Sequence, residues 1–228
     1  CERRHRFRRA LAARLDSVSL VNINPHDYAE GFIAEDSVKS AARARGVEIG
    51  THDVSPGTGA YLRHLAQLLS AQSVVEIGTG SGVGSLWLLE GMIKSGTLTS
   101  IDDEMEHSSI AKLAFAQAEI EAPRFRLITN SVMDVMTKLA DRAYDLVVFR
   151  HNPEDLNFAI SEAHRVLRSG GVFVIDNFFG GAKVPDPAQR DPKTIALREA
   201  GKAIKADSES WMSVLITTGD GLLLATKL

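Results

Sequence analysis

The sequence predicts an α/β protein in which a mostly parallel sheet carries helices on both faces. From residue 73 onward, short apolar stretches alternate with helical stretches, and a glycine-rich turn follows the first apolar stretch. This alternation is typical of parallel strands joined by helices. From residue 211 the pattern changes, because two apolar stretches flank Asp220-Gly221. That arrangement predicts an antiparallel hairpin at the C-terminal end of the sequence.

The individual elements follow from apolar spacing and capping residues. A helix is expected over 28–45, before Gly46. Another begins after Ser55-Pro56, because serine suits an N-cap and proline suits the first helical turn. Strands are expected at 73–77, 97–101, 125–129, 144–149, 171–175, 211–217 and 222–226. The remaining helices are expected at 86–93, 104–118, 132–139, 156–167 and 194–206.

Composition and charge exclude several classes of protein. Of the 228 residues, 44% are hydrophobic and 24% are charged, which suits an ordinary globular core. The formal charge is −3, and six arginines and one glutamate give the first 14 residues +5, which leaves −8 for residues 15–228. An acidic body argues against nucleic-acid binding, and no apolar stretch is long enough for a transmembrane helix. The single cysteine, Cys1, favours a cytoplasmic location.

The glycine-rich turn carries the strongest signal for a ligand. It reads Glu76-Ile77-Gly78-Thr79-Gly80-Ser81-Gly82 and lies between the first strand and its helix. Glycines allow a tight turn and close approach of a ligand, at the sheet edge where open α/β proteins bind ligands. Asp102 ends the second strand, and a carboxylate there can accept hydrogen bonds from both hydroxyls of a ribose. The sequence therefore predicts a nucleoside site.

The glycine spacing separates two classes of nucleoside ligand. A nicotinamide-dinucleotide turn needs a third glycine, where this chain has Val83 or Ser85, depending on the register. The acid two positions before Gly78 suits S-adenosylmethionine better, because that ligand ends in an amino acid rather than a pyrophosphate. An NAD-dependent oxidoreductase is therefore the weaker alternative.

From about residue 33 onward, the chain resembles the class I S-adenosylmethionine-dependent O-methyltransferases of the catechol/caffeoyl-CoA type, in particular their small bacterial members. The matching segments are Val54-Ser55-Pro56, Glu76 to Gly82, Ser100-Ile101-Asp102, 144–149, 167–171, Val174-Ile175-Asp176-Asn177 and Gly219-Asp220-Gly221. The resemblance implies a Rossmann-like methyltransferase fold with seven strands, one of them antiparallel. It also implies a homodimer that methylates a small-molecule hydroxyl, phenol-like or carboxylate.

A single methyltransferase domain is expected over 21–228, preceded by a basic, solvated segment at 1–20. No repeat or low-complexity linker divides the chain. Within the domain, N-terminal helices occupy 25–70 and a cofactor-binding core occupies 71–177. A substrate-side loop and the hairpin follow over 178–228.

The resemblance also implies a set of cofactor-binding residues. They are Val54, Ser55, Glu76, Gly78, Thr79, Gly80, Gly82, Gly84, Ser85, Asp102, Asp103, Ser131, Val132 and Met133. Glu76, Gly78 and Gly80 would line the methionine end. Asp102 would hold the ribose, and 131–133 would lie near the adenine. Gly84 stands where the family usually has a serine that contacts the cofactor's carboxylate.

The predicted metal site departs from the family. Members bind Mg²⁺ through an Asp after the fourth strand and an Asp-Asn pair after the fifth. Asp176 and Asn177 supply the pair here, but Arg150 replaces the first Asp and Pro153 replaces a lysine base. A guanidinium does not give up its proton, so the third ligand is missing and Mg²⁺ is not expected. The expected catalytic residues are His151, Asp176 and Arg150, with His151 as the nearest base.

Three roles stay open for Arg150. It could replace the cation, pairing with Asp176 and positioning an anionic oxygen of the acceptor. It could form a structural salt bridge in a degenerate site, which would make the chain an S-adenosylmethionine-binding protein with a sensory or structural role. Finally, it could point away, so that His151 or Asn152 joins Asp176 as a ligand.

Overall fold

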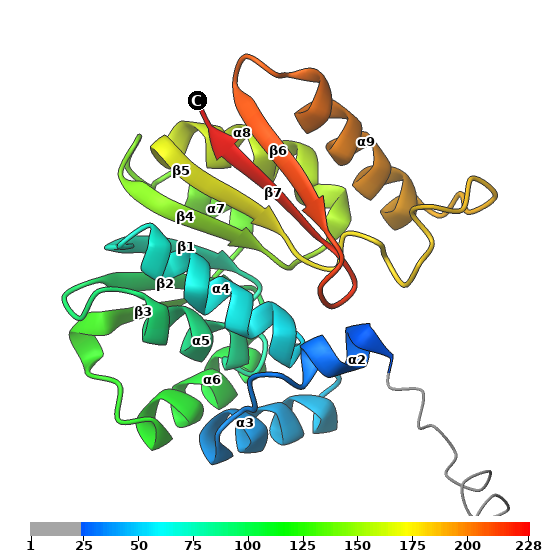
Figure 1. The fold of residues 1–228 in the computed structure, drawn as a ribbon. Coiled ribbons are helices and arrows are strands. Elements are labelled where there is room, and N and C mark those ends of the chain that lie inside the picture. The colour runs from blue at the N-terminus through cyan, green and yellow to red at the C-terminus, as the bar shows by residue number, and fades with distance from the viewer. Residues whose placement is uncertain (1–23) are drawn as a thin grey trace, which may run out of the picture.

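The computed structural model describes residues 24–228, so the predicted segment 1–20 lies outside the described part. Seven strands form one sheet in the order β3-β2-β1-β4-β5-β7-β6 (Figure 1). Strands β1 to β5 run parallel, whereas β7 is antiparallel to both of its neighbours. The strands are β1 Ser73–Ile77, β2 Thr97–Asp102, β3 Phe125–Thr129, β4 Tyr144–Phe149, β5 Leu167–Ile175, β6 Trp211–Ile216 and β7 Leu222–Lys227. The predicted fold class is confirmed.

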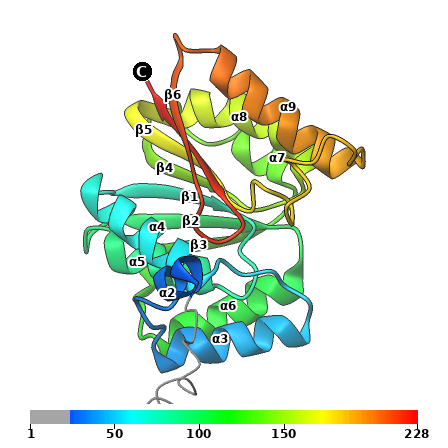
Figure 2. The same ribbon diagram turned by 45° about the vertical axis from the view of Figure 1, so that its right-hand side comes forward.

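Helices cover both faces of the sheet (Figures 1 and 2). One layer contains α3 Ser37–Glu48, α4 Pro56–Leu68, α5 Val83–Gly91 and α6 Met105–Gln117. The other contains α7 Val132–Met136, α8 Leu156–Val166 and α9 Pro192–Ala206. Each layer has its own core, since Trp87 and Phe115 are buried in the first and Phe149 and Phe173 in the second. The consecutive residues Val74 and Val75 of β1 point into different cores, because successive side chains of a strand point to opposite faces of the sheet.

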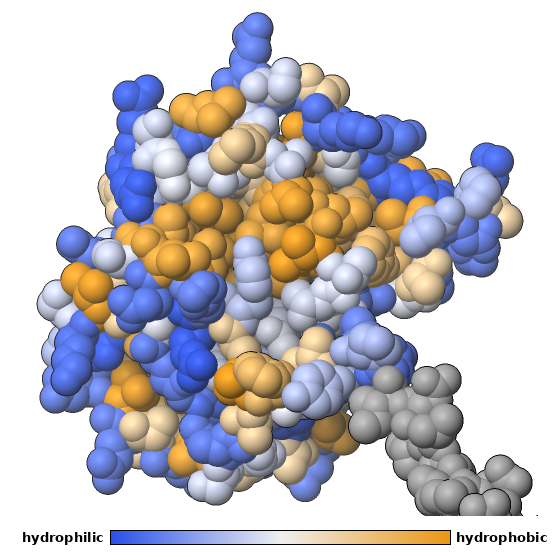
Figure 3. Space-filling model, in the orientation of Figure 1, coloured by the Kyte–Doolittle hydropathy of each residue, from blue (hydrophilic) through white to orange (hydrophobic). Residues whose placement is uncertain are grey.

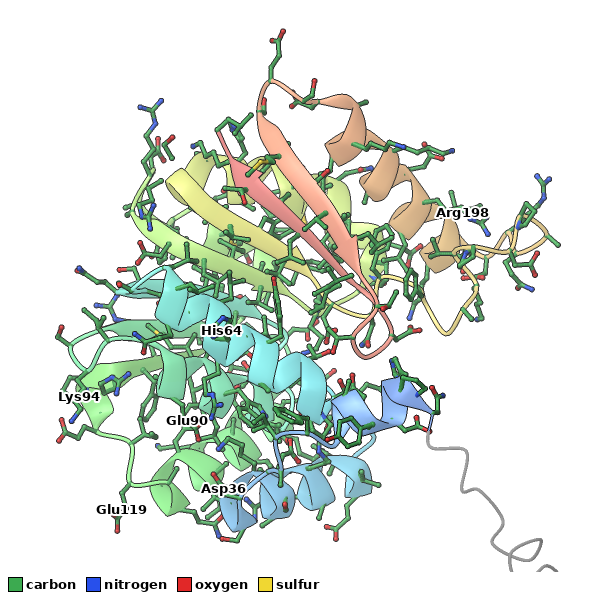
Figure 4. All side chains as sticks on the ribbon, in the orientation of Figure 1. Asp36, His64, Glu90, Lys94, Glu119 and Arg198 are labelled. Atoms are coloured by element: carbon green, nitrogen blue, oxygen red, sulfur yellow. The ribbon has the colours of Figure 1, made fainter. Side chains whose placement is uncertain are left out.

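The single helix expected over 28–45 is wrong, because the structure has two helices there. Helix α2 spans Pro25–Glu30, and α3 begins at Ser37 after a break. Asp36 causes the new start: its carboxylate accepts hydrogen bonds from the backbone N–H groups of Val38 and Lys39, both at 2.9 Å. The buried Lys39 ammonium then pairs with Asp36 and with Glu90 on α5. Figure 4 labels both acids, Asp36 at the start of α3 and Glu90 on α5.

Other boundaries differ from the prediction by a few residues. Helix α4 begins at the predicted place, with Ser55 accepting a hydrogen bond from the N–H of Thr58 at 3.2 Å. Helix α5 begins at Val83 rather than residue 86, because Gly82 takes a left-handed conformation as its N-cap. Strand β5 begins at Leu167 rather than 171. Two short 3-10 turns, Ala122–Arg124 and Pro153–Asp155, complete the described elements. Within residues 24–228, the helices are too short or too polar to cross a membrane.

Candidate functional site

The carboxyl ends of β1, β2, β4 and β5 meet at one edge of the sheet, and a cavity lies there. After β1 the chain turns through 78–82 into α5. At Gly78, φ is 92° and an added Cβ would lie 2.0 Å from the carbonyl oxygen of Arg150. Because the turn packs directly against the chain that leaves β4, only glycine fits at that position.

Asp102, at the end of β2, holds this turn in place. Its Oδ2 accepts a hydrogen bond from the N–H of Gly80 at 3.0 Å. Its Oδ1 accepts one from the N–H of Glu104 at 3.0 Å and lies 3.0 Å from Nδ1 of His107 on α6. Sequence reasoning missed His107 as a partner of Asp102. The available signal was its position in the first turn of the helix that directly follows the strand.

Glu76 lies beneath the turn with its side chain almost fully buried. Its Oε2 accepts hydrogen bonds from the hydroxyls of Ser85 and Ser100, the latter at 2.7 Å. The Ser100 hydroxyl also lies 2.7 Å from that of Thr79. Burial raises the pKa of the Glu76 carboxyl, although Arg150 and the two serines oppose this effect. Glu76, Ser85, Ser100 and Thr79 therefore form a buried polar network beneath the turn.

Asp53 is a second residue that sequence reasoning missed. Its carboxylate accepts hydrogen bonds from the hydroxyl and the N–H of Ser81, at 2.7 and 3.2 Å. Its side chain is 2% exposed. It joins the segment before α4 to the glycine-rich turn. The available signal was its position beside Val54-Ser55, which the resemblance placed at the methionine end.

Arg150 is the first residue after β4, and its guanidinium turns toward the glycine-rich turn. Nη2 donates a hydrogen bond to the carbonyl oxygen of Gly78 at 2.8 Å and lies 3.7 Å from Oε1 of Glu76. Nη1 lies 3.8 Å from Oδ1 of Asp53. The predicted pairing with Asp176 does not occur, because the ion pairs that Arg150 forms within the described residues are with Asp53 and Glu76. The Arg150 side chain is 5% exposed and the residue lines the cavity. The reading in which His151 or Asn152 joins Asp176 as a ligand stays a prediction.

One atom of Arg150 has no partner. Its Nε–H is buried and meets no hydrogen-bond acceptor within the part of the chain that the structure describes. A buried polar group without a partner costs about 1–3 kcal/mol. The guanidinium is thus held in place by the carbonyl oxygens of Gly78, His52 and Thr79 and by nearby carboxylates, while its Nε–H stays unused.

Asp176 and Asn177 follow β5 on the opposite side of the cavity from Asp102. Oδ1 of Asp176 accepts a hydrogen bond from the N–H of Asn177 at 2.8 Å, whereas its buried Oδ2 meets no donor among residues 24–228. Burial raises the pKa of the Asp176 carboxyl above its ordinary value, and the charge of Arg150 opposes this effect. A carboxylate with a raised pKa and a free oxygen is suited to accept a proton.

The residues at this edge do not fit a divalent cation. Asp176 and Asn177 offer oxygen ligands, but Arg150 holds the sequence position of the family's third ligand and brings a positive charge to the same cavity. Among the described residues, His, Cys, Asp and Glu form no group of three or more that could hold a metal ion. A hard cation such as Mg²⁺ prefers several oxygen ligands, and a cationic side chain in that position repels it.

His151 lies at the rim of the cavity. Its Nε2 is 3.8 Å from a carboxylate oxygen of Asp103 and 3.6 Å from one of Asp155. Its side chain is 20% exposed, which is more than that of Arg150. His151 therefore faces acids at the entrance, and its role as a base stays a prediction.

The cavity has a volume of about 550 Å³, which is within the usual range for small-molecule sites. The side where the cofactor is predicted to bind is lined by Gly78, Gly80, Asp102, Asp103 and His107. Its other side is lined by residues of the loop after β5 and of α9, namely Asn177, Gly180, Lys183, Asp191, Lys193, Thr194 and Leu197. Arg150, His151 and Asp176 lie between the two.

Several predicted cofactor residues do not line this cavity. Val54 is buried in the core, and Ser55 caps α4. The lining also lacks Glu76, Thr79, Gly82, Gly84 and Ser85. Ser131, Val132 and Met133, at the start of α7, also stand outside it, and Met133 is 51% exposed. The cavity therefore joins the predicted ribose and acceptor positions, whereas the adenine position stays a prediction.

The loop between β5 and α9 is held by Arg198 of α9, which points toward that loop in Figure 4. The Arg198 guanidinium donates hydrogen bonds to the carbonyl oxygens of Lys183, Val184 and Gln189, at 2.9, 2.8 and 2.6 Å, and to that of Asp186. The side of the cavity that this loop lines thus depends on Arg198.

Comparison with known proteins agrees with this arrangement. A family model described as O-methyltransferase matches residues 27–228. A relative from Mycobacteroides abscessus, provisionally named an O-methyltransferase, is 44% identical over 200 residues, which cover 88% of this chain and 93% of the relative. A similarly named protein from Mycobacterium sp. (strain KMS) is 46% identical, with 88% and 90% covered.

Solved structures give the same result. A protein from Corynebacterium glutamicum is 30% identical with a TM-score of 0.81, covering 88% of this chain and 94% of that one. The O-methyltransferase TomG from Streptomyces achromogenes, solved with S-adenosylmethionine, is 26% identical with a TM-score of 0.79, with 88% and 93% covered. The chain belongs to the O-methyltransferase family. This membership confirms the predicted enzyme class, S-adenosylmethionine-dependent O-methyltransferases.

Proposed function

We propose that this chain transfers a methyl group from S-adenosylmethionine to a hydroxyl or carboxylate oxygen of a small molecule without a divalent cation. The observation that carries the proposal is the cavity that joins Asp102, at the end of β2, to Asp176, at the end of β5. TomG, a structural relative with the same fold, was solved with S-adenosylmethionine.

The charges at the methionine end suit this cofactor. Asp53 and Glu76 flank the guanidinium of Arg150, and Asp102 and Asp176 lie on the two sides of the cavity. S-Adenosylmethionine carries a sulfonium, an ammonium and a carboxylate, so its net charge is positive. A site with more carboxylates than cations attracts such a ligand. Asp102 would hold the ribose, and Gly78 and Gly80 would lie against the methionine end.

Methyl transfer needs placement of the acceptor oxygen more than it needs acid or base chemistry. S-Adenosylmethionine supplies the methyl group on a sulfonium that is already a leaving group. The protein's contribution is to hold the acceptor oxygen in line, where well-oriented reactants gain a large rate advantage. Asp176 takes the proton of the acceptor hydroxyl on its free Oδ2. A positioned base adds about 10²–10⁴-fold to such a step.

Calorimetry and a methyl-transfer assay test this proposal together. The purified chain is treated with EDTA and titrated with S-adenosylhomocysteine and, separately, with NAD. It is then incubated with methyl-labelled S-adenosylmethionine and a panel of phenols and aromatic acids, with and without Mg²⁺. We expect binding of S-adenosylhomocysteine, no binding of NAD, and labelled product in EDTA. A strict Mg²⁺ requirement contradicts the metal-free mechanism, and binding without turnover on the whole panel favours the degenerate alternative.

We also propose that two copies of this chain associate through β6. This strand is at the edge of the sheet, and Met212, Val214 and Leu215 are 62%, 53% and 45% exposed. Hydrophobic surface gathers over β6 and β7 in Figure 3. An open edge strand can pair with another copy of itself. Light scattering should give about twice the 24.7 kDa of one chain, and Val214→Glu should give a monomer. A monomer at every concentration in the unaltered chain contradicts the proposal.

The cytoplasmic location and the absence of nucleic-acid binding stay predictions.

A further inference from the structure

We propose that Arg150 binds the carboxylate of the cofactor's methionine end, which makes it a specificity-determining residue of the cofactor site. The inference rests on the proposed binding of S-adenosylmethionine and goes beyond it, because it assigns one cofactor group to one side chain. It differs from all three roles that the sequence left open for this arginine.

The first observation is the unused donor capacity of a buried guanidinium. The carboxylates of Glu76 and Asp53 lie 3.7 and 3.8 Å away, beyond the 2.7–2.9 Å of a charge-assisted hydrogen bond. The short hydrogen bond of this group, at 2.8 Å, goes from Nη2 to the carbonyl oxygen of Gly78. Longer ones go from Nη1 to the carbonyl oxygen of His52 at 3.4 Å and from Nη2 to that of Thr79 at 3.5 Å. The buried Nε–H has no acceptor among residues 24–228. Arginine binds a carboxylate through two parallel N–H groups, and this guanidinium still has donors to offer.

The second observation is the lack of space for a side chain at Gly84. A Cβ at that position would lie 2.6 Å from Oε1 of Glu76 and 3.5 Å from Nη2 of Arg150. A serine at 84, which the family usually uses to contact the cofactor's carboxylate, would thus crowd Glu76 and the guanidinium. The guanidinium of Arg150 therefore lies next to the position that the hydroxyl of a serine at 84 would take. Arg150 supplies the donor that Gly84 cannot.

The third observation is the local charge. Asp53 and Glu76 are both within 4 Å of Arg150, and the charge of Arg150 also acts on Asp176. Without a cation, these acids would repel the carboxylate of the ligand while attracting its ammonium and sulfonium. Beside Asp53 and Glu76, Arg150 supplies a positive group among negative ones, which matches the charge pattern of a cationic amino acid. The guanidinium would then distinguish ligands that have a carboxylate from ligands that lack it.

The test compares three ligands by calorimetry on the full chain. S-Adenosylhomocysteine has the whole amino-acid end, decarboxylated S-adenosylmethionine keeps the ammonium without the carboxylate, and 5′-methylthioadenosine keeps only the nucleoside thioether. The variants are Arg150→Met and Arg150→Lys. Arg126→Met is the matched control, since Arg126 is exposed on β3. Thermal melting of each variant reports whether it folds.

We expect Arg150→Met to weaken S-adenosylhomocysteine binding about 10- to 100-fold, the value of a hydrogen bond to a charged group. The affinity of this variant for 5′-methylthioadenosine should change less than about twofold. Decarboxylated S-adenosylmethionine should bind to the variant more tightly than to the unaltered chain. Arg150→Lys should fall between, because lysine keeps the charge but loses the paired donors. Arg126→Met should bind all three ligands as the unaltered chain does.

The following outcomes overturn the inference or the function on which it rests. If Arg150→Met binds S-adenosylhomocysteine more tightly or equally well, the guanidinium stands in for the ligand's ammonium or only supports the fold. If Arg150→Met melts early, Arg150→Lys decides: an affinity equal to that of the unaltered chain contradicts a paired contact. If the unaltered chain binds 5′-methylthioadenosine but shows no preference for S-adenosylhomocysteine, the carboxylate contact is wrong although the nucleoside site stands. If it binds none of the three, the proposed function itself is wrong.

Discussion

Asp176→Asn separates the catalytic role of Asp176 from its effect on stability. The substitution keeps the shape of the side chain and removes its charge. The carboxyl is almost fully buried, its Oδ2 has no hydrogen-bond donor within the described residues, and burial raises its pKa. A buried polar atom without a partner costs about 1–3 kcal/mol, and a charged one costs more than a neutral amide. In the free enzyme at neutral pH, the ionised form of Asp176 is therefore destabilising.

The variant should accordingly be more stable and much less active. Removing about 1 kcal/mol of unfavourable burial raises the melting temperature of a chain of this size by about 2–4 °C. The loss of a proton acceptor should lower kcat by about 10²–10⁴-fold on a phenol of ordinary acidity, with little change in the affinity for S-adenosylhomocysteine. Differential scanning fluorimetry at pH 7.5 and the labelled-methyl assay measure the two effects.

The pH dependence provides an independent check. Because the pKa of Asp176 is raised in the folded state, the chain gains stability from this group as the pH falls through the folded pKa, and loses it as the pH rises. Methyl transfer should show the opposite trend, since only the ionised carboxylate accepts a proton. In Asp176→Asn the acidic limb of the rate profile should disappear. A variant that melts lower than the unaltered chain and keeps full activity would refute the assignment of Asp176 as the base.

Three further predictions concern the cofactor turn and the acceptor loop. Asp102→Ala should weaken S-adenosylhomocysteine binding about 10- to 100-fold in calorimetry, because it removes the expected partner of the ribose hydroxyls; unchanged affinity would place the nucleoside elsewhere. Gly78→Ala should lower the free energy of unfolding by more than the 1–3 kcal/mol of backbone strain alone, since its Cβ would meet the carbonyl oxygen of Arg150 at 2.0 Å. Gly50→Ala is the matched control in urea unfolding, because Gly50 has φ +78° but nothing within 4 Å of an added Cβ, and an equal loss in both would show that the close contact is unimportant. Arg198→Ala should release the loop after β5 and raise KM for the acceptor several-fold while leaving S-adenosylhomocysteine affinity intact; a change in cofactor affinity instead would contradict its placement on the acceptor side.

The sheet and the cofactor turn were predictable because their signals are local. Alternating strands and helices fix a parallel sheet, and side chains directly after its strands must lie at one edge. Asp102 follows from that rule, whereas Asp176 came from the resemblance to the family. The break between α2 and α3 was missed because apolar spacing continues through it, whereas the competing signal, the cap formed by Asp36, depends on one side chain.

The orientation of Arg150 could not be derived from the sequence. Its place after β4 is local information, but the direction of its side chain depends on Asp53 and Glu76, which come from two other segments. Asp53 itself lies 28 residues before its partner Ser81, and no periodic pattern links them. Contacts of this kind arise only when the segments pack together.

A crystal structure of this chain soaked with S-adenosylhomocysteine tests the central claim most directly. We expect density for the nucleoside at the carboxyl edge of β1 and β2, with the ribose hydroxyls on Asp102 and the sulfur facing the side of the cavity where Asp176 lies. An empty crevice at a saturating ligand concentration, or a nucleoside bound with its sugar away from Asp102, would contradict it.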